Sequence, residues 1–333
     1  MKKINRHVIH TFFGMSTMAI PLLISALFNN LWLGVMSCFG ALIFMYYVPA
    51  NQQKTMSQLL IVDAISVLAL PISALLAGSL ATVLWIGILA FSSQYILTKE
   101  KMFGPQAFFI LMINGMLSSL DQISIITRLL LTLYIIFGIG IATIFALIEN
   151  WCYDKYAITV RLTSVKFTQR IEFMRAVNYS LFAMLAYFIG IHSHLNNYYW
   201  LLVSAITILQ AENISTARHR QYHYVIAGVV GCIFALLIYT TIHETFLLMI
   251  LAVILMGIIC FTMPKSYLVG NFFTTPIALI LFKLVRPELG TNLIITRLIA
   301  ILIGTSIGIV GVGVGVGVVV VVFDIIMRQI KSL

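Results

Sequence analysis

Charged residues are scarce in this chain of 333 residues, because Asp, Glu, Lys and Arg together make up 9% of it. Hydrophobic residues make up 61%, and the mean hydropathy is +1.06. An ordinary soluble domain has roughly 25% charged residues. The shortage of charge leaves no room for a sizeable soluble domain and predicts an all-α polytopic membrane protein.

Cysteine is also rare, and the four cysteines stand singly in or beside apolar runs, without the spacing of metal ligands. They are typical of packing thiols, so we predict neither a metal site nor a disulfide framework. These cysteines are Cys38, Cys152, Cys232 and Cys260.

Recognisable catalytic motifs are missing as well. The sequence has no phosphate-binding P-loop, no dinucleotide fingerprint after a strand and no His-Glu-x-x-His motif. Its ten acidic residues are scattered rather than clustered. We therefore predict that the protein is not an enzyme and holds no cofactor.

What the chain does have is twelve apolar runs in two groups of six. A helix that crosses about 30 Å of hydrocarbon needs roughly 20 apolar residues, so we expect about twelve transmembrane helices. The predicted parts are a first repeat over 1–148, a cytoplasmic connector over 149–172 and a second repeat over 173–333. The runs are 9–28, 31–49, 57–76, 79–97, 104–120, 126–148, 174–191, 198–211, 224–242, 246–263, 268–285 and 294–323.

The basic residues are distributed unequally between the two sides that alternate along these runs. Sixteen of the twenty fall on the side of the N-terminus, and the other four are Arg128, Lys283, Arg286 and Arg297. Because cytoplasmic loops carry the excess of Lys and Arg, both termini are predicted to be cytoplasmic. The net charge of +10 therefore reflects mainly the excess of Lys and Arg in the predicted cytoplasmic loops, and no nucleic-acid partner is predicted.

Three short sequence matches recur in the same order in both halves, at similar separations. Together they indicate a tandem repeat. Each unit has an even number of spans, so the two copies insert with the same orientation, and a cavity between them is expected. The matches are Ile125-Ile-Thr-Arg-Leu129 with Ile294-Ile-Thr-Arg-Leu298, Trp32-Leu33 with Trp200-Leu201, and Phe108-Phe109 with Phe272-Phe273.

The segment from Tyr198 to Arg220 begins as an apolar helix with aromatic residues at its front and becomes polar at Gln210. It is too short to span a membrane alone, so it is either buried among other helices or lines a water-filled path. Gln210 and Arg218 are candidates for an inner gate or substrate mouth, and a solvated loop is the alternative. The counterpart at 31–48 is expected to be longer.

Charged residues inside apolar runs are the main candidates for function. Arg128 and Arg297 occupy equivalent positions in the two halves. If they point inward, their guanidinium groups suit a carboxylate, and if they point outward, they anchor the helix ends at the interface. Asp63 lies well inside an apolar run and is a candidate for proton coupling, as is Glu212 after the short helix. A structural pairing of Asp63 is the alternative.

Two further patterns have both a structural and a functional interpretation. Glycines from Gly304 to Gly317 recur at four-residue spacing, which is typical of closely packed helices, although a hinge is the alternative. In Thr274-Thr-Pro276 the proline frees a backbone carbonyl. This predicts either a packing kink or a small polar patch at Thr275 that faces the cavity.

The second half of the chain resembles the fusaric-acid-resistance-like family, which includes bacterial aromatic-acid exporters. The first half has less of this likeness, and Ala211 stands where the family usually has proline. The residues that carry the resemblance are Tyr199-Trp200-Leu-Leu-Val-Ser204, Gln210, Thr216-Ala-Arg218-His-Arg220, Gly228-Val-Val-Gly231, Phe272-Phe-Thr-Thr-Pro276, Arg297 and Gly304.

The resemblance implies an inner-membrane efflux carrier, driven by protons, that exports organic anions such as aromatic carboxylic acids. Trp200 then joins the arginines and Gln210 as a candidate substrate-binding residue. The expected partners are membrane lipid, the organic anion and protons, with a homo-oligomer or an accessory periplasmic subunit as further options. A passive anion channel and a non-transporting scaffold of the cell envelope are the alternative functions.

Overall fold

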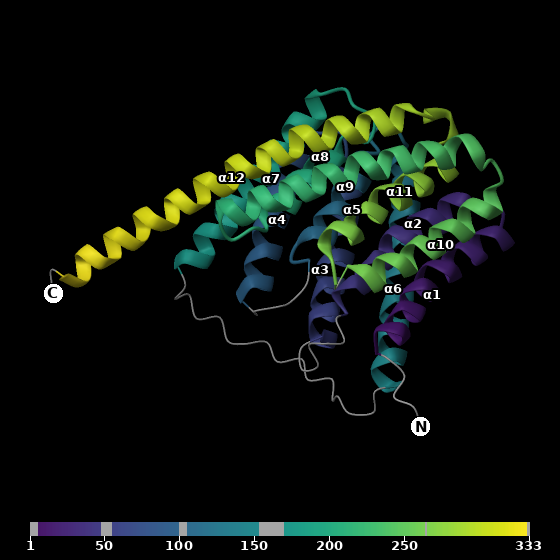
Figure 1. Ribbon diagram of the computed structural model, residues 1–333, viewed down its shortest axis with the longest axis horizontal. Helices are drawn as coiled ribbons and strands as arrows, with labels where there is room; N and C mark the ends of the chain where they lie inside the picture. Colours follow the sequence, from purple (N-terminus) through teal and green to yellow (C-terminus); the bar gives the residue numbers. More distant parts are fainter. Residues whose placement is uncertain (1–5, 48–54, 100–104, 153–169, 264, 332–333) are drawn as a thin grey trace.

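The computed structural model describes residues 6–47, 55–99, 105–152, 170–263 and 265–331, and within these ranges the chain folds into helices and no strands (Figure 1). The first six helices are α1 (Arg6–Leu27), α2 (Leu31–Ala41) with the 3-10 helix η1 (Leu42–Tyr46), α3 (Thr55–Leu76), α4 (Ala81–Lys99), α5 (Phe108–Ser118) and α6 (Ile125–Cys152). The other six are α7 (Arg170–His192), α8 (Tyr199–Leu209), α9 (Ile214–Thr241), α10 (Thr245–Thr262), α11 (Tyr267–Val285) with η2 (Pro287–Leu289) after it, and α12 (Asn292–Lys331).

Nine of the described helices are long and apolar enough to cross a membrane. The predicted number of helices is thus found, but α2, α5 and α8 have only 11 residues each. Eleven residues span about 16 Å, roughly half of the hydrocarbon thickness. Three of the twelve helices are thus too short to cross the hydrocarbon by themselves. The counterpart of α8 continues from α2 through η1 to Tyr46, so it is longer than α8, as the sequence predicted.

The three short helices lie inside the bundle. Every residue of α8 is buried, as are eight residues of α2 and nine of α5. Helix α8 packs against α12 and α7, α2 packs against α6 and α1, and α5 packs against α3. A helix that is apolar on all sides is stable in such surroundings because protein covers each of its faces.

The helix pairings of the first half recur six helices later along the chain. Helix α2 packs on α6 as α8 packs on α12, and α3 packs on α6 as α9 packs on α12. Across the two halves, α1 packs on α10 as α7 packs on α4, and α2 packs on α11 as α8 packs on α5. In Figure 1, α12 extends past the other helices toward the C-terminus.

Glycines allow the closest of these helix pairs to form. A Cβ atom on Gly138 of α6 would lie 1.9 Å from the carbonyl oxygen of Ser37 on α2, and one on Gly304 of α12 would lie 2.5 Å from that of Leu201 on α8. These distances are below any van der Waals contact, so side chains are excluded there. The packing interpretation of the glycines in α12 is confirmed at Gly304, whereas a Cβ on Gly313 would meet no described atom within 4 Å.

The predicted connector over 149–172 is partly helical at both ends. Residues 149–152 continue α6 and residues 170–172 begin α7, while residues 153–169 lie outside the described part of the chain. Helix α11 continues through Pro276 without interruption. The cysteine thiols are free, with Cys38, Cys232 and Cys260 buried and Cys152 exposed.

Candidate functional site

A cavity of about 500 Å³ lies between helices of the two halves. Its lining comes from α1, α2, η1 and α5 of the first half and from α8 to α12 of the second half. Pockets for small organic ligands commonly have about 300–1,000 Å³ and lie between packed helices. The cavity is therefore large enough for a small organic molecule.

Aromatic rings form much of the cavity wall, and their orientations are held by contacts with one another. The indole nitrogen Nε1 of Trp200 donates a hydrogen bond of 2.8 Å to the hydroxyl of Tyr199. The ring of Phe282 lies edge-on to that of Trp200, with the ring centroids 5.7 Å apart. Phe108 and Phe109 of α5 line the cavity from the first half of the chain. Such a lining suits a ligand with a flat apolar body.

The guanidinium of Arg297 is the buried positive charge of this cavity. The residue is 4% exposed, and its Nη2 donates a hydrogen bond of 3.0 Å to the hydroxyl of Tyr224. Its Cζ atom lies 5.5 Å from the ring centroid of Trp200. Its Nε and Nη1 atoms are buried without a hydrogen-bond partner.

No carboxylate in the described part of the chain forms an ion pair with Arg297. A buried charge that lacks its partner costs several kcal/mol, of the order of 3–5 when a pair is broken. Two donor nitrogens without a partner and an uncompensated charge are features that a carboxylate satisfies, because its oxygens accept charge-assisted hydrogen bonds from a guanidinium. Arg297 therefore presents an unpaired positive charge and unsatisfied donors in a cavity lined by aromatic side chains.

The other polar lining residues lie toward the helix ends on the side where α1 begins. Gln210 follows the last residue of α8, and its Nε2 donates a hydrogen bond of 2.9 Å to the carbonyl of Pro105. Arg220 lines the same cavity from α9, one helical turn before Tyr224. Asn271 and Thr274 line it from α11. Gln210 and Arg297 thus lie toward opposite ends of the cavity, since Gln210 follows the end of α8 and Arg297 lies beside Trp200 near its start.

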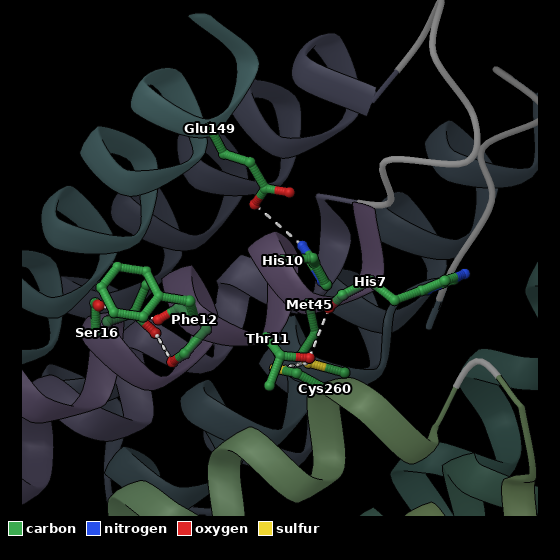
Figure 2. A network of polar contacts seen from close by, with 10 residues as sticks. His7, His10, Thr11, Phe12, Ser16, Met45, Glu149 and Cys260 are labelled. Carbon is green, nitrogen blue, oxygen red and sulfur yellow. Dashed lines mark hydrogen bonds and ion pairs between the residues drawn. The ribbon is translucent and has the colours of Figure 1, made fainter. Parts of the chain in front are cut away.

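His10 of α1 also lines the cavity, and it contacts a buried acid of α6. Its Nδ1 lies 3.1 Å from Oε2 of Glu149, which is fully buried (Figure 2). Within the described residues, no group of three or more His, Cys, Asp or Glu side chains could hold a metal ion.

Three of the candidate residues from the sequence come together in this cavity, namely Arg297, Gln210 and Trp200. Arg128 is not among the described lining residues, although it is only 9% exposed. Its Nη1 donates a hydrogen bond of 3.2 Å to the carbonyl of Ala77. The two equivalent arginines therefore do not share one cavity.

Four other candidates also lie outside the described lining of the cavity. Asp63 accepts a hydrogen bond of 2.7 Å from the hydroxyl of Thr143, while its Oδ1 is buried without a partner. Thr275 is buried where α11 packs on α9 at Gly231, whereas its neighbour Thr274 lines the cavity. The remaining two, Arg218 and Glu212, are exposed.

The sequence interpretation missed several lining residues. Tyr224 follows Arg220 by four residues and Thr274 follows Asn271 by three, so helical periodicity could have placed each pair on one face. His10 and Glu149 are 139 residues apart, and nothing local in the sequence indicates that they meet.

Comparison with known proteins identifies one family. Residues 181–311 match the family described as fusaric acid resistance protein-like, a segment of less than half of the chain that contains Trp200, Gln210 and Arg297. The family resemblance predicted from the sequence is confirmed over this segment. No curated protein and no solved structure matches the chain. The family is one of membrane transporters rather than enzymes.

Proposed function

We propose that this multi-pass membrane protein, whose second half carries a fusaric acid resistance protein-like segment, is a secondary transporter that exports organic anions. The observation that carries the proposal is the state of Arg297. It is buried in a cavity between the two halves, with two N–H donors unsatisfied and no carboxylate of the described residues paired with it. An anion that enters the cavity would complete this site.

The proposed substrates are aromatic carboxylates. A carboxylate would accept a hydrogen bond from the free Nε–H or from a free Nη1–H of Arg297, which lie on different edges of the guanidinium. Its ring would lie against Trp200 and the phenylalanines of α5. Arginine supports this role better than lysine because its planar fork matches a carboxylate and also stacks on aromatic rings. The cavity volume of about 500 Å³ accommodates a substituted benzene ring.

The proposed orientation rests on the distribution of basic residues. Sixteen basic residues lie on the side of the N-terminus and four on the other side, so both termini are proposed to be cytoplasmic in a bacterial inner membrane. The polar end of the cavity at Gln210 and Arg220 then faces the cytoplasm. A substrate that enters from there would move past the polar residues toward Arg297.

The proposed mechanism is alternating access by two duplicated six-helix units. The recurrence of the helix pairings six helices later supports duplication, together with the three sequence matches. Rocking of one unit against the other would close one end of the cavity and open the other, as in carriers built from parallel repeats. The direction of transport and its coupling to protons belong to this proposal, with Asp63 and Glu212 as the coupling candidates from the sequence.

The proposal is tested with purified protein in liposomes and radiolabelled 4-hydroxybenzoate, with protein-free liposomes to measure leakage of the acid. The wild type should bind the acid in detergent and accumulate it in response to a pH gradient. Arg297→Gln should weaken binding by about tenfold or more, because hydrogen bonds to a charged group contribute about 1.5–3 kcal/mol. Arg286→Gln is the matched control, since Arg286 pairs with Glu288 outside the lining of the cavity.

The same experiment separates the alternatives. A passive anion channel would give currents and flux without any pH gradient. A scaffold protein would neither bind nor move the acid, and the proposal would then fail. Equal affinities of wild type and Arg297→Gln would remove Arg297 from the binding site.

A further inference from the structure

We propose that His10 and Glu149 form the site at which the driving proton is bound and released. This inference rests on the proposed function as a proton-driven transporter. It assigns the coupling role to a pair of residues that the sequence did not single out, in place of Asp63 and Glu212. The ligand of the site is a proton, and the argument starts from the burial of Glu149.

Glu149 lies in the last turn of α6 and is fully buried. His10 lies in the second turn of α1, is 8% exposed, and places its Nδ1 3.1 Å from Oε2 of Glu149. Figure 2 shows the carboxylate pointing from α6 toward the imidazole of α1. The two side chains therefore form a direct buried contact between the start of one helix and the end of another.

A buried carboxylate needs either a proton or a nearby positive charge, because isolated burial of a charge costs several kcal/mol. The imidazole supplies the second option, since histidine changes charge in the physiological pH range. We assign proton binding to this pair because its two ionisable side chains are in direct, buried contact.

The pair also has access to the substrate. His10 lines the cavity that contains Arg297, so its ring lies between the cavity and the buried carboxylate. The ring is held by stacking on Phe44, with the centroids 4.9 Å apart. With Nδ1 at Glu149, Nε2 is the ring nitrogen left to exchange a proton with the cavity. In the proposal, release of that proton leaves one negative charge on the pair.

Other titratable and charged groups lie around the pair. His7 lines the cavity from α1, Tyr47 from the end of η1, Cys260 from α10 and Arg220 from α9. The thiol of Cys260 lies directly opposite Gly14 of α1, so α1 and α10 are close in space. By contrast, Asp63 is outside the described lining of the cavity and so lacks this access to the substrate.

The location of the pair links its charge to the movement of the two halves. Helix α1 packs on α6 and α2 of its own half and also on α10 of the other half. A negative charge left on the pair after proton release acts at this junction. It also lies in the wall of the cavity that holds the buried positive charge of Arg297. Substrate binding and proton binding therefore affect each other through one set of charges.

The test compares two transport assays on wild type, His10→Gln and Glu149→Gln in proteoliposomes. Exchange of internal for external 4-hydroxybenzoate without a pH gradient needs binding and conformational change but no proton coupling. Accumulation driven by a pH gradient needs the proton site as well. Glu149→Gln should keep exchange near the wild-type rate, because Glu149 is outside the described lining of the cavity. Both variants should lose accumulation by about tenfold or more, the usual range of a coupling free energy.

His243→Gln and Glu244→Gln are the matched controls, because both residues are exposed between α9 and α10. They should retain both activities. If Glu149→Gln does not fold, His10→Gln decides alone, because glutamine retains a hydrogen-bond donor but cannot change its charge. Wild-type-like accumulation by His10→Gln, or loss of exchange together with accumulation by a folded Glu149→Gln, would overturn the inference.

Asp63→Asn is measured in parallel. Uncoupling by Asp63→Asn with normal coupling in His10→Gln would assign the proton site to Asp63 and refute the inference for the histidine. If the wild type exchanges no 4-hydroxybenzoate at all, the proposed function fails, and the role of the pair fails with it. The rate of exchange by the wild type therefore distinguishes a failure of the proposed function from a failure of the inference about the pair.

Discussion

Two arginines at equivalent positions of the sequence have different surroundings in the folded chain. Arg128 donates to the carbonyl of Ala77, whereas Arg297 lies beside Trp200 and donates to Tyr224. Both are nearly buried, so neither anchors a helix end in water. Arg297 lines the cavity, whereas Arg128 is not among the described lining residues.

Replacement of Arg297 by lysine separates the contribution of charge from that of geometry. Arg297→Lys keeps a positive charge but loses the planar fork and the stacking on Trp200. We expect binding of 4-hydroxybenzoate to be weaker than in the wild type by about fivefold to tenfold, yet stronger than in Arg297→Gln. Equilibrium binding of the radiolabelled acid in detergent measures this order, and equal affinities for the lysine and glutamine variants would contradict a charge-based site.

At the scale of the helices, close packing at glycine decides how α12 is placed. Helix α12 approaches α8 so closely at Gly304 that a Cβ would lie 2.6 Å from the Cβ of Ser204. At Gly313 the same helix has no described atom within 4 Å of an added Cβ. The two glycines therefore differ in how closely other atoms pack against them, although both belong to one pattern in the sequence.

The substitutions Gly304→Ala and Gly313→Ala test this difference. Alanine at Gly304 must push α12 away from the backbone of α8, and overpacking of this kind costs about 1–3 kcal/mol. Alanine at Gly313 should be neutral or slightly stabilising, because alanine favours helix more than glycine does. Thermal unfolding in detergent measures both. A loss of transport in Gly313→Ala at unchanged stability would instead support a hinge at that position.

At the scale of the whole molecule, the buried short helices create the site. Helix α8 reaches only about 16 Å through the bundle, and its last turn and Gln210 open into the cavity between the halves. The aromatic start of the same helix brings Trp200 next to Arg297. The cavity thus combines one short helix of the second half with walls from both halves.

The orientation of the whole molecule is tested at Cys152, the exposed native cysteine at the end of α6. The described structure buries the other three thiols. If the N-terminus is cytoplasmic, a membrane-impermeant maleimide should label Cys152 in inside-out vesicles and not in right-side-out cells. The variant Cys152→Ser gives the background. Labelling only from the outside would reverse the proposed topology.

The sequence by itself determined the class of the protein, the number of helices and the resemblance of its second half to the fusaric acid resistance protein-like family. These follow from composition, from runs of apolar residues and from local motifs, all of which are properties of neighbouring residues. It also singled out Arg297, Gln210 and Trp200, because a charge or amide within an apolar run is costly and therefore stands out.

Only the tertiary structure decided which of the two arginines faces the cavity and that His10 meets Glu149. It also decided that α2 and α5 are as short as α8. The physical reason is that these features depend on packing between helices far apart in the chain. The free energy of a buried side chain is set by what surrounds it, and the surroundings of Arg297 and Glu149 come from helices of distant sequence.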